Sequence, residues 1–295
     1  MLEIRNITKA FNKTLAVDSL SFEVPQGSVF GLLGPNGAGK TTMIRMIMNI
    51  IRPDSGHIFY NGELIQRSRY KRVGYLPEER GLYQKMKLKE TIVYLARLKG
   101  LSSSDASKRT DRFLERFELT AYSHRKIEEL SKGNQQKVQF IIAVIHDPVL
   151  VILDEPFSGL DPVNQLLLKD IINELKQNGT TVIFSTHQME QVERMCNEIC
   201  LISQGKRILY GDLAQIKKDF GTQTISLEFT GDAKAIEDVE LDDLSICNGR
   251  LTGILRNADS LNDFLRKVME RVTVTGFRVE EPTLEQIFIK HVKEV

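Results

Sequence analysis

The sequence has no long apolar run, only three cysteines and almost no net charge. Its longest apolar stretches, at residues 140–145 and 149–153, are far shorter than the ~20 residues that a helix needs to cross a bilayer. The beginning, MLEIRNITKA, also lacks the basic and then apolar segments of a secretory signal. We therefore expect a chain that does not span a membrane and that lies in the cytoplasm.

The few cysteines and the balanced charge exclude two further classes of protein. Cys196 and Cys200 are spaced i, i+4, but no neighbouring cysteine pair or histidine cluster completes a zinc site, so we expect buried, reduced thiols. Lys and Arg number 40 against 39 Asp and Glu. This balance provides no basic field of the kind that holds a nucleic-acid backbone, so nucleic acid is not expected as a partner.

The chain length predicts two domains, and the residue pattern changes near residue 221. Before that point, apolar strand-like runs alternate with helical patterns, which is typical of an α/β domain with a mainly parallel core sheet. An antiparallel patch is expected around the Asn61-Gly62 turn, and a helical insert at about residues 85–145. For residues 221–295 we predict a small α+β domain, with a hairpin turn at Asn248-Gly249 and a helix that Thr283 and Gln286 cap.

Residues 34–42, GPNGAGKTT, follow a predicted strand and open a predicted helix. This is the phosphate-binding loop pattern in its required context, because glycines let backbone N–H groups approach phosphate oxygens and the helix start favours negative charge. Lys40 is expected to reach the β- and γ-phosphates, and the Thr41 hydroxyl is suited to Mg²⁺. The candidate phosphate-binding residues are Gly34, Pro35, Asn36, Gly37, Ala38, Gly39, Lys40, Thr41 and Thr42.

Two carboxylates, Asp154 and Glu155, end the apolar run of residues 149–153. Behind a phosphate-binding loop, Asp154 is placed to hold Mg²⁺ and Glu155 to act as the general base on the attacking water. Adjacent acids at a strand end can also be a merely solvated terminus. A phosphate loop and two acids still leave GTPases, kinases, helicases and transporters open.

The run LSKGNQQ, residues 130–136, resembles the LSGGQ signature of the ABC ATPases. Ser131 can cap the following helix, whose free N–H groups can bind a γ-phosphate, which in this family belongs to the opposite subunit. The resemblance implies nucleotide contacts for Ser131, Lys132, Gly133 and Asn134. On the local pattern alone, Ser131 could equally be only a helix cap.

Further motifs of the same family follow in order over about residues 1–215. The segment SGLD that ends at Asp161 resembles the dimer-contacting D-loop, and His187 in Ser-Thr-His resembles the switch histidine that contacts the γ-phosphate. Phe11 matches the aromatic position on which adenine stacks, and we also expect Val17 to contact the nucleotide. For Phe11 a core position is the alternative.

Two departures from the family pattern concern the signature and the Q-loop. Lys132 and Asn134 replace common signature residues, and Glu78 stands where the family usually has a glutamine, so Glu78 is a candidate both for catalysis and for Mg²⁺. The Glu78 region, the signature variant and the carboxy-terminal residues 281–288 most resemble an exporter branch that includes sodium-extrusion and peptide-antibiotic-resistance ATPases.

The resemblance implies an ATPase in which two copies, head to tail, sandwich two ATP molecules with Mg²⁺. It implies a separate transmembrane permease as partner, through which the homodimer would associate with the inner face of the cell membrane and power transport, with export favoured. The alternative is an ABC-like ATPase that acts on DNA or on the ribosome. The short segment between phosphate loop and signature, without sustained heptads, argues against the DNA-acting class, and the single set of motifs argues against the ribosome-acting class.

Overall fold

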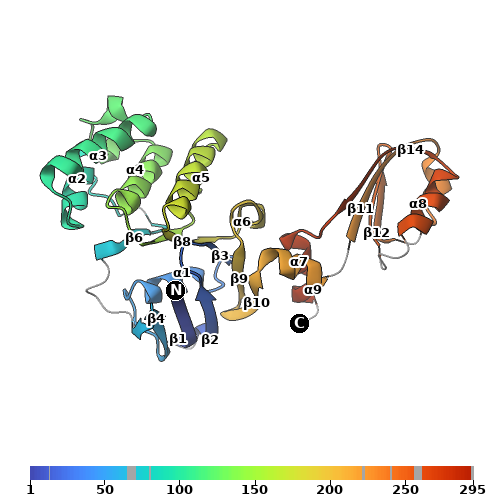
Figure 1. The fold of residues 1–295 in the computed structure, drawn as a ribbon, viewed down its shortest axis with the longest axis horizontal. Coiled ribbons are helices and arrows are strands. Elements are labelled where there is room, and N and C mark those ends of the chain that lie inside the picture. The colour runs from blue at the N-terminus through green and yellow to red at the C-terminus, as the bar shows by residue number, and fades with distance from the viewer. Residues whose placement is uncertain are drawn as a thin grey trace. The chain divides into compact units, whose positions relative to one another are not determined.

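The computed structural model describes residues 1–12, 14–64, 71–79, 81–220, 223–239, 241–255 and 261–293. The chain divides into two compact units, Met1–Asp212 and Leu213–Val295 (Figure 1). Residue 221, at which the sequence predicts the second domain to begin, lies outside the described residues.

A six-stranded sheet forms the centre of the first unit, in the order β10-β9-β3-β8-β7-β6. Every neighbouring pair is parallel except β9 and β10, so the predicted mainly parallel core is confirmed. The apolar runs of the sequence are its central strands, which are buried along their whole length. The strands are β3 (Val29–Leu33), β6 (Val73–Leu76), β7 (Leu150–Asp154), β8 (Thr181–Thr186), β9 (Glu198–Ser203) and β10 (Lys206–Asp212).

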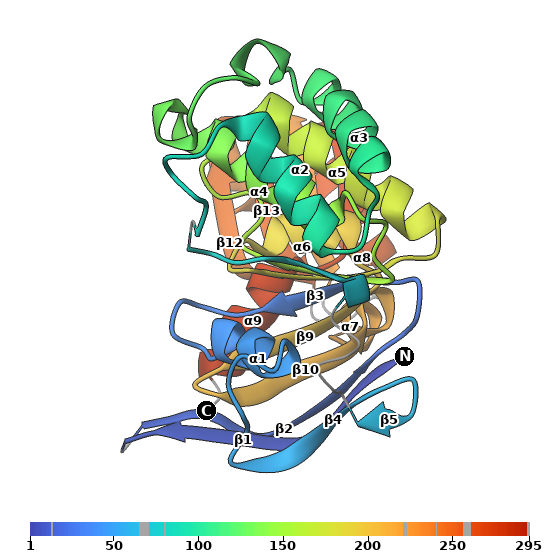
Figure 2. The ribbon, with the colours of Figure 1, turned by 90° about the vertical axis from the view of Figure 1, so that its left-hand side faces the viewer.

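A second, antiparallel sheet has the order β2-β1-β4-β5, and the predicted Asn61-Gly62 turn joins its last two strands. Helix α1 (Lys40–Ile47) lies between the two sheets, and its buried Met43, Ile44 and Ile47 share one core with apolar residues of both (Figure 2). The strands are β1 (Leu2–Phe11), β2 (Thr14–Val24), β4 (Ser55–Tyr60) and β5 (Glu63–Leu64).

Helices cover the face of the six-stranded sheet opposite α1 (Figures 1 and 2). The helical insert is present as predicted. Gly100, with φ +105°, follows the end of α2, and the Ser102 side chain accepts the Asp105 N–H to cap α3. The helices of this unit beyond α1 are α2 (Leu88–Leu98), α3 (Ser103–Arg116), α4 (Lys132–Val144), α5 (Pro162–Gln177) and α6 (Met189–Met195).

The second unit has its own antiparallel sheet, in the order β12-β13-β11-β14, with α8 packed on β14 and a separate apolar core that includes Leu227, Phe264 and Val268. The predicted turn at Asn248-Gly249 joins β12 to β13, and Thr283 and Gln286 exchange hydrogen bonds of 2.9 and 3.2 Å at the start of α9. The elements are α7 (Leu213–Phe220), β11 (Gln223–Thr230), β12 (Asp242–Cys247), β13 (Arg250–Leu255), α8 (Leu261–Met269), β14 (Thr273–Glu280) and α9 (Leu284–Lys293).

The expected cysteine state is confirmed: Cys196 and Cys200 are free and buried, and burial raises the pKa of the Cys200 thiol to about 12. Among the described residues, no helix is long and apolar enough to cross a membrane.

Candidate nucleotide-binding site

The loop between β3 and α1 is shaped by glycines that approach other backbone segments closely. A Cβ on Gly34 would lie 2.1 Å from the carbonyl oxygen of Ile202, and one on Gly39 would lie 2.4 Å from that of Ala16. Both positions also have positive φ, +150° and +106°. Only glycine satisfies these two constraints, so the loop keeps the conformation that exposes its backbone N–H groups.

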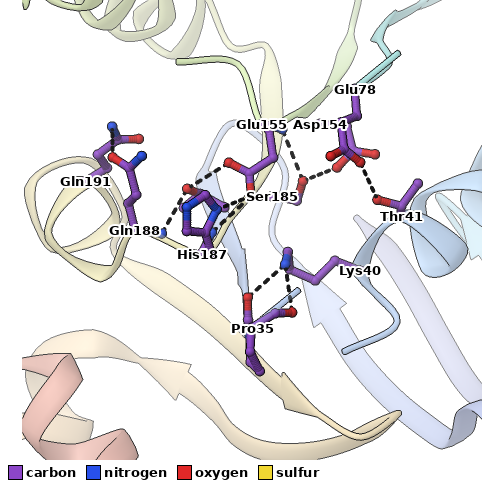
Figure 3. Close-up of polar contacts among 12 residues, drawn as sticks. Pro35, Lys40, Thr41, Glu78, Asp154, Glu155, Ser185, His187, Gln188 and Gln191 are labelled. Carbon is purple, nitrogen blue, oxygen red and sulfur yellow. Dashed lines mark hydrogen bonds and ion pairs between the residues drawn. The ribbon is translucent and has the colours of Figure 1, made fainter. Parts of the chain in front are cut away.

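Lys40 begins α1 and folds back over this loop (Figure 3). Its Nζ donates to the carbonyl oxygens of Gly34 at 2.7 Å and Pro35 at 3.1 Å, and the residue is 6% exposed. Burial lowers the pKa of Lys40, whereas the nearby carboxylates of Glu155 and Asp154 raise it. The ammonium group is therefore held at the mouth of the loop, where a phosphate can replace its carbonyl partners.

The last residue of β7, Asp154, is fully buried and is paired in register with Ser185 of β8. The Ser185 hydroxyl donates to Oδ1 of Asp154, while Oδ2 of Asp154 is buried without a hydrogen-bond partner in the part of the chain that the structure describes. Burial raises the pKa of Asp154, and the hydrogen bond from Ser185 opposes that rise. An unpartnered buried carboxylate oxygen is costly and calls for a cation or a donor.

Glu155 follows in a left-handed conformation, with φ +49°, and its carboxylate turns toward the end of β8 (Figure 3). Oε1 accepts the His187 N–H at 3.1 Å and lies 2.8 Å from Nδ1 of the same residue, and Oε2 accepts the Thr186 hydroxyl at 3.3 Å. The Glu155 side chain is 12% exposed, whereas that of His187 is 48% exposed.

Glu78 approaches the same site from the loop after β6. Its Oε2 accepts a long hydrogen bond of 3.5 Å from the Thr41 hydroxyl. Together with Asp154, Glu155 and the phosphate-binding loop, these residues line a cavity of roughly 380 Å³. Its lining residues are Ala16, Asn36, Gly37, Ala38, Gly39, Lys40, Thr41, Thr42, Glu78, Asp154 and Glu155.

The oxygen atoms in this cavity are of the type that Mg²⁺ prefers as ligands. Thr41, Glu78 and Asp154 provide hard oxygens, and Oδ2 of Asp154 is without a partner among the described residues. No group of three His, Cys, Asp or Glu that could hold a metal by itself occurs in the described parts of the chain. Because Mg²⁺ usually keeps several waters and shares substrate phosphates, a sparse protein ligand set is what such a site requires.

Comparison with known proteins decides the family. An ABC transporter ATP-binding protein of Bacillus subtilis (strain 168), YhaQ, is 44% identical over 100% of this chain and 99% of its own length. The chain belongs to the ATP-binding proteins of ABC transporters. The ABC transporter family model matches residues 17–158, and that of the DrrA1-3-like ATP-binding protein C-terminal domain matches residues 211–292. This ABC protein is an ATPase whose activity is coupled to transport.

Other relatives of this ABC ATPase carry more specific names. The linearmycin resistance ATP-binding protein LnrL of B. subtilis is 32% identical over 98% of this chain and 97% of its own. The Nod factor export ATP-binding protein I of Burkholderia pseudomallei (strain 1710b) is 37% identical over 71% of this chain and 70% of its own length. A solved ATP-binding subunit of an ABC transporter covers 75% of this chain and 93% of its own, with a TM-score of 0.70 and 32% identity.

The ABC signature residues lie apart from this cavity. Ser131 caps α4 by accepting the Asn134 N–H at 3.2 Å, and Gly133 lies close to the Gly159 carbonyl of the loop before α5. Asp161 caps α5 by accepting the Asn164 N–H at 2.9 Å. Ser131, Lys132, Gly133, Asn134 and Asp161 are all absent from the cavity lining.

Phe11 and Val17 also lie outside the lining. Phe11 is 45% exposed, with Nζ of Lys9 5.5 Å from its ring centre, so its ring is not a core residue in this ABC ATPase. Val17 is fully buried, and it is the neighbouring Ala16 that reaches the cavity. The nucleotide-contact roles of Phe11 and Val17 stay predictions.

Sequence reasoning missed Ala16, Ser185 and Thr186. Ser185 and Thr186 precede the switch histidine, but their partners Asp154 and Glu155 depend on which strand lies beside β8. Ser185 and Thr186 could have been recognised in the sequence as two hydroxyl side chains at the end of an apolar strand. A buried polar side chain there needs a hydrogen-bond partner.

Proposed function

We propose that two copies of this chain, arranged head to tail, bind two ATP molecules between them and use hydrolysis to power export through a separate membrane subunit. The observation that carries the proposal is the division of the motifs: the phosphate-binding loop, Asp154 and Glu155 line one cavity, and the signature around Ser131 is outside it. A γ-phosphate in this cavity therefore lacks the helix start of α4, which a second copy can supply.

Each side chain of the cavity has a role in this proposal. Backbone N–H groups of the loop and the Lys40 ammonium bind the β- and γ-phosphates, while Thr41, Asp154 and Glu78 would hold Mg²⁺. Mg²⁺ held there would supply positive charge that offsets the negative charge developing on the transferred phosphate. Glu155 takes the proton of the attacking water, and His187, which is outside the cavity lining, holds the Glu155 carboxylate through Nδ1.

Export and the permease partner rest on the relatives and on the sequence. The names of two relatives refer to Nod factor export and to linearmycin resistance, and LnrL matches this chain along almost its whole length. We infer that the protein is held at the cytoplasmic face of the membrane through the permease alone. The near balance of 40 basic and 39 acidic residues favours this protein partner over nucleic acid.

Mixing inactive variants tests the composite site. Lys40→Ala disables the phosphate loop, and Ser131→Arg disables the signature. In a mixed dimer, the loop of the Ser131→Arg copy faces the intact signature of the Lys40→Ala copy, so ATPase activity should return. A mixture of Lys40→Ala with Glu155→Gln is the matched control, because both defects lie on the loop side and no complete site can form. If mixed dimers form but no activity returns in the first mixture, the head-to-tail arrangement is wrong.

A further inference from the structure

Ser185 touches both members of the Asp154–Glu155 pair through a single side-chain oxygen. Its Oγ donates to Oδ1 of Asp154 and accepts the backbone N–H of Glu155 at 3.3 Å. A serine hydroxyl has one proton to donate and can accept, so both contacts are possible at once. The Ser185 side chain is also fully buried.

The strand pairing fixes this arrangement. Asp154 and Ser185 are partners in the parallel β7–β8 register, so their side chains project to the same side of the sheet. With Oδ1 of Asp154 engaged by the hydroxyl, Oδ2 is left without a partner among the described residues. Thus one oxygen of the carboxylate is anchored and the other is available.

The second contact acts on the backbone of Glu155. Glu155 has a φ of +49°, which is unfavourable for a residue with a Cβ. Its N–H is held both by the Ser185 hydroxyl and by the Ser185 carbonyl oxygen, at 3.3 and 3.2 Å. These bonds stabilise the turn that directs the Glu155 carboxylate toward His187.

We propose that Ser185 is a positioning residue for ATP hydrolysis, which orients the metal-facing oxygen of Asp154 and the backbone of the base Glu155 through one hydroxyl. The proposal rests on the roles of Asp154 and Glu155 given under Proposed function. Loss of the hydroxyl frees the Asp154 carboxylate to rotate and leaves the Glu155 N–H with the Ser185 carbonyl oxygen alone as acceptor. Metal affinity and turnover should therefore fall together, while nucleotide affinity without metal should not.

The test compares wild type with Ser185→Ala, Ser185→Thr and Asp154→Asn. Binding of a fluorescent ATP analogue is measured without metal and across a Mg²⁺ titration, and kcat and KM for ATP are measured at saturating Mg²⁺. We expect Ser185→Ala to raise the Mg²⁺ midpoint several-fold and to lower kcat about ten-fold, in line with the loss of one positioned contact, with metal-free binding unchanged. Ser185→Thr, which keeps the hydroxyl, should restore both values.

Thr181→Ala is the matched control, because Thr181 is another buried hydroxyl of β8, which accepts the Gly27 N–H at 2.9 Å. If Thr181→Ala changes the Mg²⁺ midpoint and kcat as much as Ser185→Ala does, or if Ser185→Ala changes neither, the positioning role is overturned. Asp154→Asn distinguishes the metal-binding role of Asp154 from the positioning role of Ser185. An unchanged Mg²⁺ midpoint in Asp154→Asn refutes the metal role of Asp154 itself, whereas a raised midpoint there with a normal one in Ser185→Ala refutes only the inference about Ser185.

Discussion

Nδ1 of His187 lies 2.8 Å from Oε1 of Glu155, and the same oxygen accepts the backbone N–H of His187. The carboxylate proposed as general base is thus tied to the residues that end β8. Any movement of this strand end toward a bound phosphate also moves the base. Hydrolysis should therefore depend on the geometry of the Glu155–His187 pair as well as on the presence of both residues.

Glu155→Gln should retain ATP binding and lose most hydrolysis. The amide preserves the shape of the side chain and can still accept hydrogen bonds through its oxygen, but it cannot take a proton from water. Turnover should fall by about 10²-fold or more. Because ATP then persists, dimers should accumulate with MgATP, which size-exclusion chromatography with light scattering can measure. A wholly monomeric variant that still holds nucleotide would contradict the proposed sandwich.

Gly34→Ala should destabilise the protein far more than Gly37→Ala. An added Cβ at Gly34 meets the Ile202 carbonyl at 2.1 Å, so β3 or β9 must shift, whereas at Gly37, φ +78°, nothing lies within 4 Å. Gly37→Ala should therefore show only the cost of its backbone conformation, about 1 kcal/mol. Chemical unfolding of both variants checks this. Equal losses in unfolding free energy would show that the loop relaxes around Gly34.

His146→Gln should reduce the sensitivity of the protein to acid. Burial, and then the charge of Lys99, lower the pKa of His146 from 6.5 to about 4, and neither ring nitrogen has a hydrogen-bond partner among the described residues. Between about pH 4 and 6.5, His146 therefore binds more protons in the unfolded chain than in the folded one. The free energy of unfolding falls as pH falls through that window, and above it His146 adds no pH dependence.

The measurement is the unfolding free energy of wild type and His146→Gln at pH 7.5 and at pH 5. The unfolding free energy of the wild type should fall more between pH 7.5 and pH 5 than that of His146→Gln. His124→Gln, at an exposed position, is the control and should behave as wild type. Equal acid losses in wild type and His146→Gln would show that the imidazole becomes hydrated when it is protonated.

Local chemistry made much of this fold predictable. The turn at Asn248-Gly249 and the cap formed by Thr283 and Gln286 involve neighbours in sequence, and both are present as expected. The phosphate loop was predictable for the same reason, because its functional groups are contiguous. The contact of Ser185 with Asp154 depends on the β7–β8 pairing, which no local pattern specifies. The entry of Ala16 into the cavity likewise depends on tertiary packing.

A chain that ends at Asp212 should still bind nucleotide. The cavity residues all belong to Met1–Asp212, and Leu213–Val295 has a core of its own. We propose that this second unit regulates or steadies the dimer, so truncation should alter dimerisation or turnover without abolishing binding. Titration of a fluorescent nucleotide into the truncated protein provides the check, with circular dichroism to confirm folding. A folded truncated chain that binds no nucleotide would refute the independence of the two units.

Glu78 is the departure from the family pattern with the most direct chemical consequence. Its Oε2 lies 3.5 Å from the Thr41 hydroxyl, and the residue lines the cavity. Burial is the largest influence on the pKa of both Asp154 and Lys40, and the charge of Glu78 raises both values. The carboxylate is thus close enough to affect a metal ligand and a phosphate ligand.

Glu78→Gln should keep much of the Mg²⁺-dependent hydrolysis, because the amide retains an oxygen for the metal or the water, whereas Glu78→Ala should lose about ten-fold or more. Without metal, the Glu78 carboxylate of the wild type repels the phosphates of the nucleotide. Both variants should therefore bind metal-free nucleotide more tightly than the wild type does. Hydrolysis and binding across a Mg²⁺ titration measure both effects. Glu79→Ala is the control, because Glu79 is the exposed neighbour, lies 3.9 Å from Arg45 and is absent from the cavity lining. A Glu78→Ala protein with the rate and metal midpoint of Glu79→Ala would remove Glu78 from the active site.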